Sequence, residues 1–104
     1  MSDRELAVRE IIEDLQTVDQ ELRNYERKYG LASAIFYELY RQGKLDNGGY
    51  ELTEDVGMWA GAYEIKLDRE RRFLELSREY LTSLRARGDR GELEFILQGE
   101  AVGI

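Results

Sequence analysis

The chain of 104 residues is long enough for one domain with a modest core, and its 42% hydrophobic and 36% charged residues indicate a folded protein. It contains neither His nor Cys, which excludes imidazole and thiolate catalysis, disulfides and the usual zinc sites. The net charge of -7 disfavours nucleic acid as the partner, and no apolar run approaches the roughly 20 residues that span a membrane.

Residues 3–29 are predicted to form the first long helix. Ser2 followed by Glu5 fits a capping box, in which the Ser oxygen accepts from an early backbone N–H. Apolar residues then recur in alternating steps of three and four, the pattern of a helix seam that packs on a partner: Val8, Ile11, Leu15, Val18, Leu22, Tyr25 and Tyr29. At 1.5 Å per residue this helix is about 40 Å long, so it needs a partner of similar length.

A short second helix is expected over residues 33–42, after a tight corner. Gly30 is placed to end the first helix in a left-handed conformation, Ser33 is the candidate N-cap of the second helix, and Gly43 ends it. Four residues form its predicted apolar face: Ile35, Phe36, Leu39 and Tyr40. The residues expected to point away from that face are Tyr37, Glu38 and Arg41.

The third helix is expected over residues 54–87, with Thr53 as its N-cap, after a loop at 45–52 whose Asp-Asn-Gly-Gly sequence favours a turn. Apolar positions follow along most of its length: Val56, Trp59, Ala60, Tyr63, Leu67, Phe73, Leu74, Leu76, Tyr80, Leu81 and Leu84. Gly57 and Gly61 lie four apart, and each costs roughly 1 kcal/mol relative to Ala inside a helix. They predict a close backbone approach, with the second helix crossing there against Trp59 and Tyr63.

The predicted fold class is all-α. The helices at 3–29 and 54–87 form a long antiparallel hairpin, and the short helix at 33–42 crosses it near the corner. Residues 1–90 make one helical domain, and residues 91–104 form a C-terminal tail. The tail fits a strand or a short helix. It is either a lid on the far end of the hairpin or a segment that folds on a partner protein, through its apolar residues: Leu93, Phe95, Ile96 and Leu97.

Carboxylates are the remaining candidates for chemistry. Glu10 and Glu13 are spaced as Glu-x-x-Glu on the first helix, and Glu64 and Asp68 are one turn apart on the third. Small helical nucleotide pyrophosphohydrolases hold Mg²⁺ with such groups, but the Glu-x-x-Asp of their later helix is missing here. A Mg²⁺-dependent hydrolase is therefore the alternative to a protein without catalytic residues, metal or cofactor.

Aromatic and acidic residues are both concentrated in the first part of the chain. Six rings could form a stacking platform for single-stranded nucleic acid, but such platforms lie in basic grooves, so core packing is favoured: Tyr25, Tyr29, Tyr37, Tyr40, Trp59 and Tyr63. Residues 1–64 contain 7 Lys and Arg against 14 Asp and Glu, whereas residues 65–104 contain 8 of each. Such an acidic surface either attracts a basic protein partner or serves solubility.

The corner also carries a family resemblance. Residues 22–45 follow the pattern Leu-x-x-Tyr-Glu-x-Lys-Tyr-Gly-x-x-Ser-x-x-Phe-Tyr-x-x-Tyr-x-x-Gly-x-Leu, and residues 59–64 read Trp-Ala-x-x-Tyr-Glu. This combination resembles small prokaryotic proteins regarded as antitoxin-like partners in toxin–antitoxin pairs, over residues 22–67. The resemblance implies a protein that binds and neutralises a toxin encoded beside it, without catalysis of its own.

A protein–protein interaction module of the cytoplasm, most specifically an antitoxin, is thus the leading hypothesis. The candidate contacts with the partner are Tyr37, Glu38, Tyr40, Arg41, Phe95 and Ile96. A third reading is a homodimer in which the long seams pair between chains, because a seam can be covered by its own chain or by a second copy.

Overall fold

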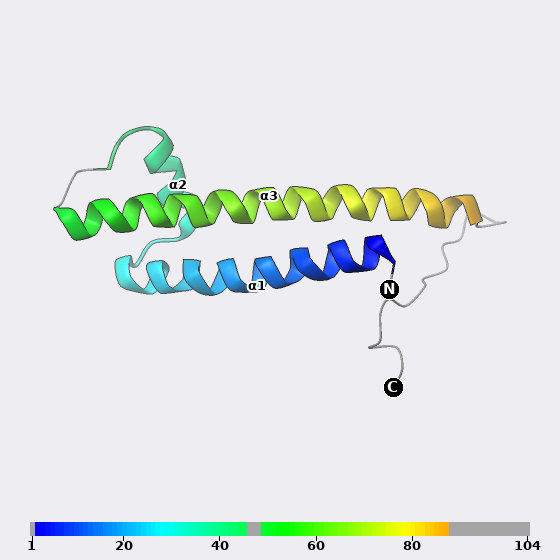
Figure 1. Ribbon diagram of the computed structural model, residues 1–104. Coiled ribbons are helices and arrows are strands. Elements are labelled where there is room, and N and C mark those ends of the chain that lie inside the picture. The colour runs from blue at the N-terminus through cyan, green and yellow to red at the C-terminus, as the bar shows by residue number, and fades with distance from the viewer. Residues whose placement is uncertain (1, 46–48, 88–104) are drawn as a thin grey trace.

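The computed structural model describes residues 2–45 and 49–87, apart from the side chains of residues 50 and 85–87, and these residues form three helices (Figure 1). α1 comprises Asp3–Tyr29, α2 Ser33–Arg41 and α3 Tyr50–Arg87. The prediction of an all-α fold, with two long helices side by side and a short one at their end, is confirmed for this part of the chain. The predicted tail at 91–104 lies outside it. Within it, no helix is both long and apolar enough to cross a membrane.

Both ends of α1 follow from local sequence signals. The Ser2 Oγ accepts a hydrogen bond from the Glu5 backbone N–H at 3.1 Å, and acidic residues lie in the first turn, where the helix dipole favours them. Gly30 adopts φ 65° and ψ 32°, a left-handed conformation that suits a residue without Cβ. Its N–H donates to the Glu26 carbonyl at 2.8 Å, so the chain leaves α1 sharply towards α2.

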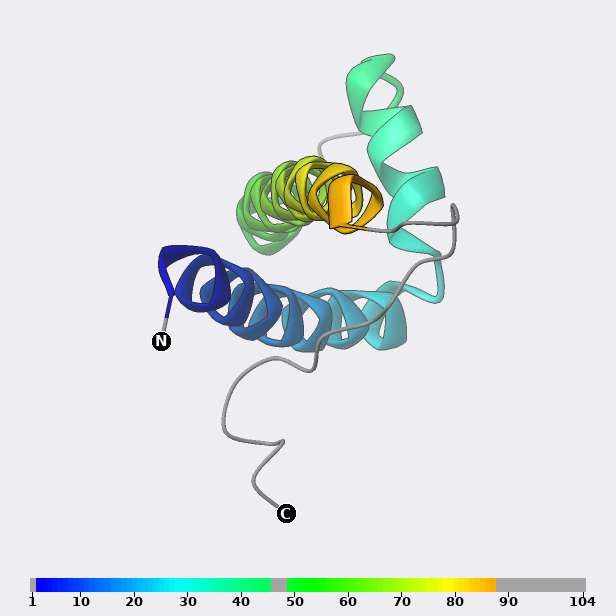
Figure 2. The ribbon, with the colours of Figure 1, turned by 90° about the vertical axis from the view of Figure 1, so that its right-hand side faces the viewer.

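α1 and α3 lie side by side as an antiparallel pair, and α2 crosses on one side of them (Figure 2). In three ion pairs the residue numbers of α3 fall as those of α1 rise: Asp14–Arg69 at 2.8 Å, Asp19–Lys66 at 3.1 Å and Lys28–Asp55 at 2.7 Å. The buried apolar residues of these two helices are Ile11, Val18, Leu22, Trp59, Ala60, Ala62, Leu76 and Leu84. The seam that α1 predicted is therefore covered within one chain.

The apolar face assigned to α3 from sequence is partly wrong. Leu67 and Leu74 are 42% and 51% exposed, although both were predicted to face the core. Counted in steps of three and four residues from Ala62 to Phe73, the positions that face α1 are 66 and 69. Each following residue is rotated by about 100° around the helix, so Leu67, directly after position 66, and Leu74, directly after Phe73, turn away from α1. The seam between α1 and α3 therefore has charged residues in its middle third.

The beginning of α3 also differs from the prediction. The helix begins at Tyr50, four residues before the expected start, and Thr53 lies inside its first turn. The Thr53 backbone N–H and Oγ1–H both bond to the Gly49 carbonyl, at 3.0 Å and 2.9 Å, so Thr53 is not the N-cap. Gly49, with φ 106°, provides the turn into the helix and thus an earlier start. α2 ends at Arg41, one residue earlier than expected.

α2 crosses α3 beside Trp59 and Tyr63, as predicted, but the predicted role of the two glycines is wrong. A Cβ at Gly57 or Gly61 would meet no other atom within 4 Å. Both glycines fall on the outer side of α3, since they lie two residues away from Trp59, which faces α1. The small residue buried beside the crossing is Ala60, which is 1% exposed.

Candidate functional site: the aromatic corner

Seven aromatic rings from the three helices form one continuous cluster where α2 meets the hairpin, and Trp59 is its centre. The Trp59 ring stacks on Phe36 with 3.8 Å between centroids, and on Tyr25 and Tyr29 with 5.6 Å. Trp59 and Phe36 are both 2% exposed. Their faces are therefore occupied by other side chains, which favours the core-packing interpretation over a platform for stacking bases.

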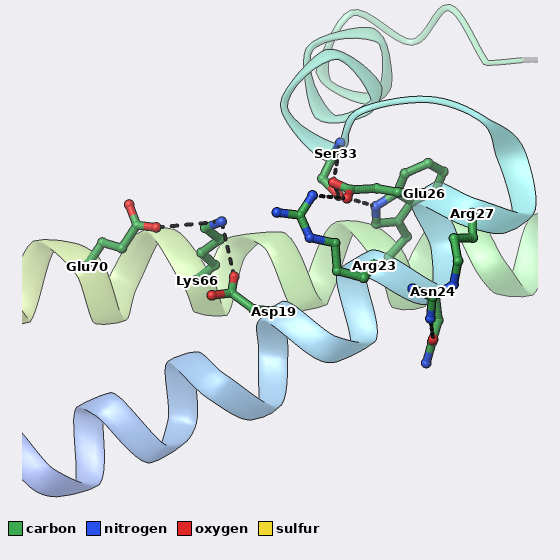
Figure 3. A network of polar contacts seen from close by, with 9 residues as sticks. Asp19, Arg23, Asn24, Glu26, Arg27, Ser33, Lys66 and Glu70 are labelled. Carbon is green, nitrogen blue, oxygen red and sulfur yellow. Dashed lines mark hydrogen bonds and ion pairs between the residues drawn. The ribbon is translucent and has the colours of Figure 1, made fainter.

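A chain of polar groups links the three helices beside these rings (Figure 3). The Trp59 indole N–H donates to the Ser33 Oγ at 2.8 Å, and the Ser33 hydroxyl donates to the Glu26 carboxylate at 2.8 Å. Glu26 also accepts from the Ser33 backbone N–H at 3.0 Å and from the Arg23 guanidinium at 2.9 Å. Each polar group buried at this contact thus has a partner, and these hydrogen bonds hold α2 against α1 and α3.

The role predicted for Ser33 is therefore wrong. Ala32 occupies the N-cap position of α2 and offers no side-chain hydrogen bond, whereas Ser33 is the first helical residue. The Glu26 carboxylate from α1 takes over the capping function, because it accepts the Ser33 N–H at the positive end of the helix. Partial burial raises the pKa of Glu26, but the hydrogen bonds from Ser33 and Arg23 outweigh it, so the pKa lies below its ordinary value.

A second set of polar contacts joins the end of α1 to the start of α3. The Lys28 ammonium bonds to the Asp55 and Glu51 carboxylates, both at 2.7 Å, and the Tyr29 hydroxyl donates to Asp55. The hydrogen bonds from Lys28 and then Tyr29 lower the pKa of Asp55, and the hydrogen bond to Asp55 raises the pKa of Lys28. The aromatic cluster is thus flanked by polar contacts on both sides.

The predicted partner contacts of α2 have different surroundings. Tyr37 is half-buried and lies 5.0 Å from the Tyr63 ring and 6.0 Å from the Tyr40 ring, so the prediction that it points away from the hairpin is wrong. Tyr40 is 40% exposed, and Glu38 and Arg41 are exposed beside it. The other two predicted contacts, Phe95 and Ile96, lie outside the described residues.

Ile35 is the surface residue that sequence reasoning missed. It was assigned to the apolar face of α2, yet it is 52% exposed. The side chains that attach α2 to the hairpin are Ser33, Phe36 and Tyr37, which lie three and four residues apart, so Ile35 falls outside their stripe. Steps of three and four residues counted from the polar Ser33, instead of from the nearest apolar residue, would have placed Ile35 on the surface.

The acidic residues of the hydrolase alternative do not converge. Glu10, Asp14 and Asp68 line one open depression of about 340 Å³, but Glu13 and Glu64 are not among its lining residues. The Asp14 carboxylate pairs with Arg69 at 2.8 Å. The Asp68 carboxylate is engaged by Arg69, at 2.6 Å, and by a second arginine. In the described residues, no three acidic side chains are grouped closely enough to hold a metal ion. This depression therefore offers paired charges rather than a set of carboxylate ligands.

Comparison with known proteins found no match: no family model, no curated protein and no solved structure matches this chain. The rings of the aromatic corner stack on one another and its buried hydrogen-bonding groups have partners, whereas its outward side exposes Ile35, Glu38, Tyr40 and Arg41.

Proposed function

We propose that this chain is a non-catalytic protein–protein interaction module, and that the outward side of α2 is its partner-binding surface. The observation that carries the proposal is a firmly attached helix with an exposed contact side: Phe36 is 2% exposed, whereas Ile35 and Tyr40 are 52% and 40% exposed beside Arg41. Tyr and Arg are enriched at interfaces. A helix that is already fixed loses little further conformational entropy on binding, which favours affinity.

In its most specific form, the proposed activity is that of an antitoxin that binds and neutralises a cognate toxin in the prokaryotic cytoplasm. The residues that carry the resemblance, 22–45 and 59–64, are the same residues that build the corner. The net charge of -7 over residues 1–64, from 7 basic and 14 acidic residues, would speed encounter with a basic partner. These two observations support the proposal.

Co-expression with the adjacent open reading frame tests the activity. The expected result is that the neighbour alone arrests growth, and that this chain restores growth and co-purifies with the neighbour. A harmless neighbour that does not co-purify would remove the antitoxin proposal. The more general interaction module would then be tested by a screen for other basic protein partners.

Substitutions on α2 test the surface. Tyr40→Ala and Arg41→Ala should each weaken binding at least tenfold, which corresponds to about 1.4 kcal/mol, because truncated interface anchors cost this much or more. Arg78→Ala is the matched control, an exposed Arg on the distant half of α3, and should leave affinity within twofold. Equal affinity for the α2 variants and the control would show that the partner binds elsewhere, and Phe95→Ala and Ile96→Ala would then test the tail.

A further inference from the structure

Among the residues that the structure describes, α2 covers only one end of the side of the hairpin on which it lies (Figure 2). α2 has 9 residues, about 14 Å of helix, whereas α1 has 27 and α3 has 38. Glu26 of α1 and Tyr63 of α3 mark this side, because they contact Ser33 and Tyr37 of α2. In a three-helix bundle a third long helix would lie along this side, and here α2 occupies only one end of that position.

Three apolar side chains continue this side beyond α2. Ile12 lies 14 residues before Glu26, and Leu67 and Leu74 lie four and eleven residues after Tyr63, so helical periodicity places them on the same side as α2. They are 38%, 42% and 51% exposed, respectively. We name these three residues the uncovered strip. Their alignment on one side makes them a candidate contact surface, whereas exposed apolar residues scattered singly would need no explanation.

We propose that residues 93–97 of the same chain, Leu-Glu-Phe-Ile-Leu, pack on the uncovered strip. This proposal does not depend on the proposed function. Leu74 lies 13 residues before the end of α3, about 20 Å back along the helix. An extended chain advances about 3.3 Å per residue, so six or seven residues beyond Arg87 reach Leu74. The apolar segment begins at that distance, at Leu93.

Charge complementarity supports the same occupant. Residues 65–87, which carry most of the strip, contain 7 Lys and Arg and 4 Asp and Glu, a net charge of +3. Residues 88–104 contain one Arg and 4 Asp and Glu, a net charge of -3. In the part of the chain that the structure describes, four of the seven basic residues at 65–87 already form ion pairs within the hairpin: Lys66, Arg69, Arg71 and Arg72. The acidic residues Glu92 and Glu94, which flank Leu93, would therefore add to existing ion pairs as the apolar residues reach the strip.

A short segment also fits this place better than a second copy does. Tyr63, which α2 covers, is four residues from Leu67, about 6 Å along α3. A long helix from another molecule laid along the strip would therefore run into α2. A segment tethered to Arg87 also acts at an effective concentration in the millimolar range, which a second molecule does not reach at micromolar protein.

Disulfide trapping in the full chain tests the proposal, and the natural absence of cysteine makes it specific. The test variant combines Leu74→Cys with Phe95→Cys. The control combines Arg72→Cys with the same Phe95→Cys, because Arg72 is two residues from Leu74 on the other side of α3 and its side chain is 54% exposed. In a glutathione redox buffer, the test pair should form an intramolecular disulfide at least tenfold faster than the control pair.

Three outcomes of the trapping experiment would overturn the proposal. Equal trapping rates would show that the segment has no preferred position, and no trapping in either variant would show that it stays away from α3. Disulfide-linked dimers as the main product at micromolar concentration would assign the strip to a second copy. Amide hydrogen exchange provides a check without cysteines: Leu74→Asp should increase exchange in residues 91–98, whereas Arg72→Asp should leave it unchanged. The same exchange in both variants would contradict the proposal.

Discussion

Replacing Ser33 with Ala tests whether the polar chain between the three helices holds the corner together. The substitution removes the acceptor of the Trp59 indole N–H, which lies 2.8 Å from the Ser33 Oγ in a residue 2% exposed. A buried donor left without a partner costs about 1–3 kcal/mol. Glu26 also loses the hydrogen bond from the Ser33 hydroxyl, so we expect a loss in the upper part of that range. In a domain of this size, each kcal/mol lowers Tm by roughly 4 °C or more.

A double-mutant cycle with Trp59→Phe separates the hydrogen bond from packing. Phe keeps an aromatic ring against Phe36 but has no N–H, so Ser33→Ala should cost at least about 1 kcal/mol less in the Trp59→Phe background than in the natural protein. Urea denaturation followed by far-UV circular dichroism measures all four proteins, because Trp59 is the only tryptophan and its fluorescence is lost in two of them.

Ser83→Ala is the matched control for this cycle. Ser83 is exposed on α3, so its replacement should change the free energy of unfolding by less than about 0.5 kcal/mol. The reasoning would be refuted if Ser33→Ala were as mild as this control, or if the Ser33 and Trp59 effects were additive within about 0.5 kcal/mol. Either result would mean that the rings fix α2 without help from the polar chain.

Four further substitutions address the same corner, each measured by urea denaturation. Phe36→Ala should cost about 3–5 kcal/mol, because it leaves a cavity under α2, whereas Ile35→Ala on the exposed side should cost less than about 1 kcal/mol. Gly30→Ala should cost about 1 kcal/mol, because φ 65° is unfavourable for a residue with a Cβ. Because folding lowers the pKa of Glu26, its ionised form stabilises the fold above the ordinary value of 4.5, and this contribution is lost as the pH falls below it. Glu26→Gln should therefore destabilise the protein at pH 7 and make stability less dependent on pH in the acid range.

Most of the helix pattern could be predicted because it depends on local signals. Ser2 and Gly30 determine the ends of α1 through hydrogen bonds to their own helix, so α1 has its predicted bounds. The start of α3 was missed because Thr53 resembles an N-cap in sequence, whereas the positive φ of Gly49 allows the helix to begin earlier. Thr53 and Gly49 thus indicated two different starts for α3, and the sequence alone does not show which of the two determines it.

The contacts that build the candidate site depend on tertiary structure, and these were only partly predictable. The pairing of the aromatic corner with Trp59 and Tyr63 followed from their apolar character. The capping of α2 by Glu26 did not, because Glu26 is seven residues from Ser33 and reaches it only after the chain turns at Gly30. A charged residue on a helix reads as solvent-exposed unless its partner from another helix is known.

The charged middle of the α1–α3 seam has a consequence for where the hairpin is most stable. Lys66 and Arg69 take seam positions there and form ion pairs with Asp19 and Asp14, and the side chains of these four residues are 32–51% exposed. Exposed ion pairs contribute about 0–1 kcal/mol each, whereas a buried large apolar side chain contributes about 1.5–3 kcal/mol. We therefore expect the aromatic corner, with Trp59 and its stacked rings, to be more stable than the charged middle of the hairpin.

Native-state hydrogen exchange tests this gradient directly. Amides near Trp59 should exchange only through global unfolding, whereas amides near Lys66 and Arg69 should exchange through smaller openings with lower free energy. Uniform exchange along α3 would show that the ion pairs hold the middle as firmly as the rings hold the corner. The expected gradient would place α2 on the part of the molecule that opens least, as a rigid binding surface requires, and would leave the polar middle as the part that gains most from an additional covering segment.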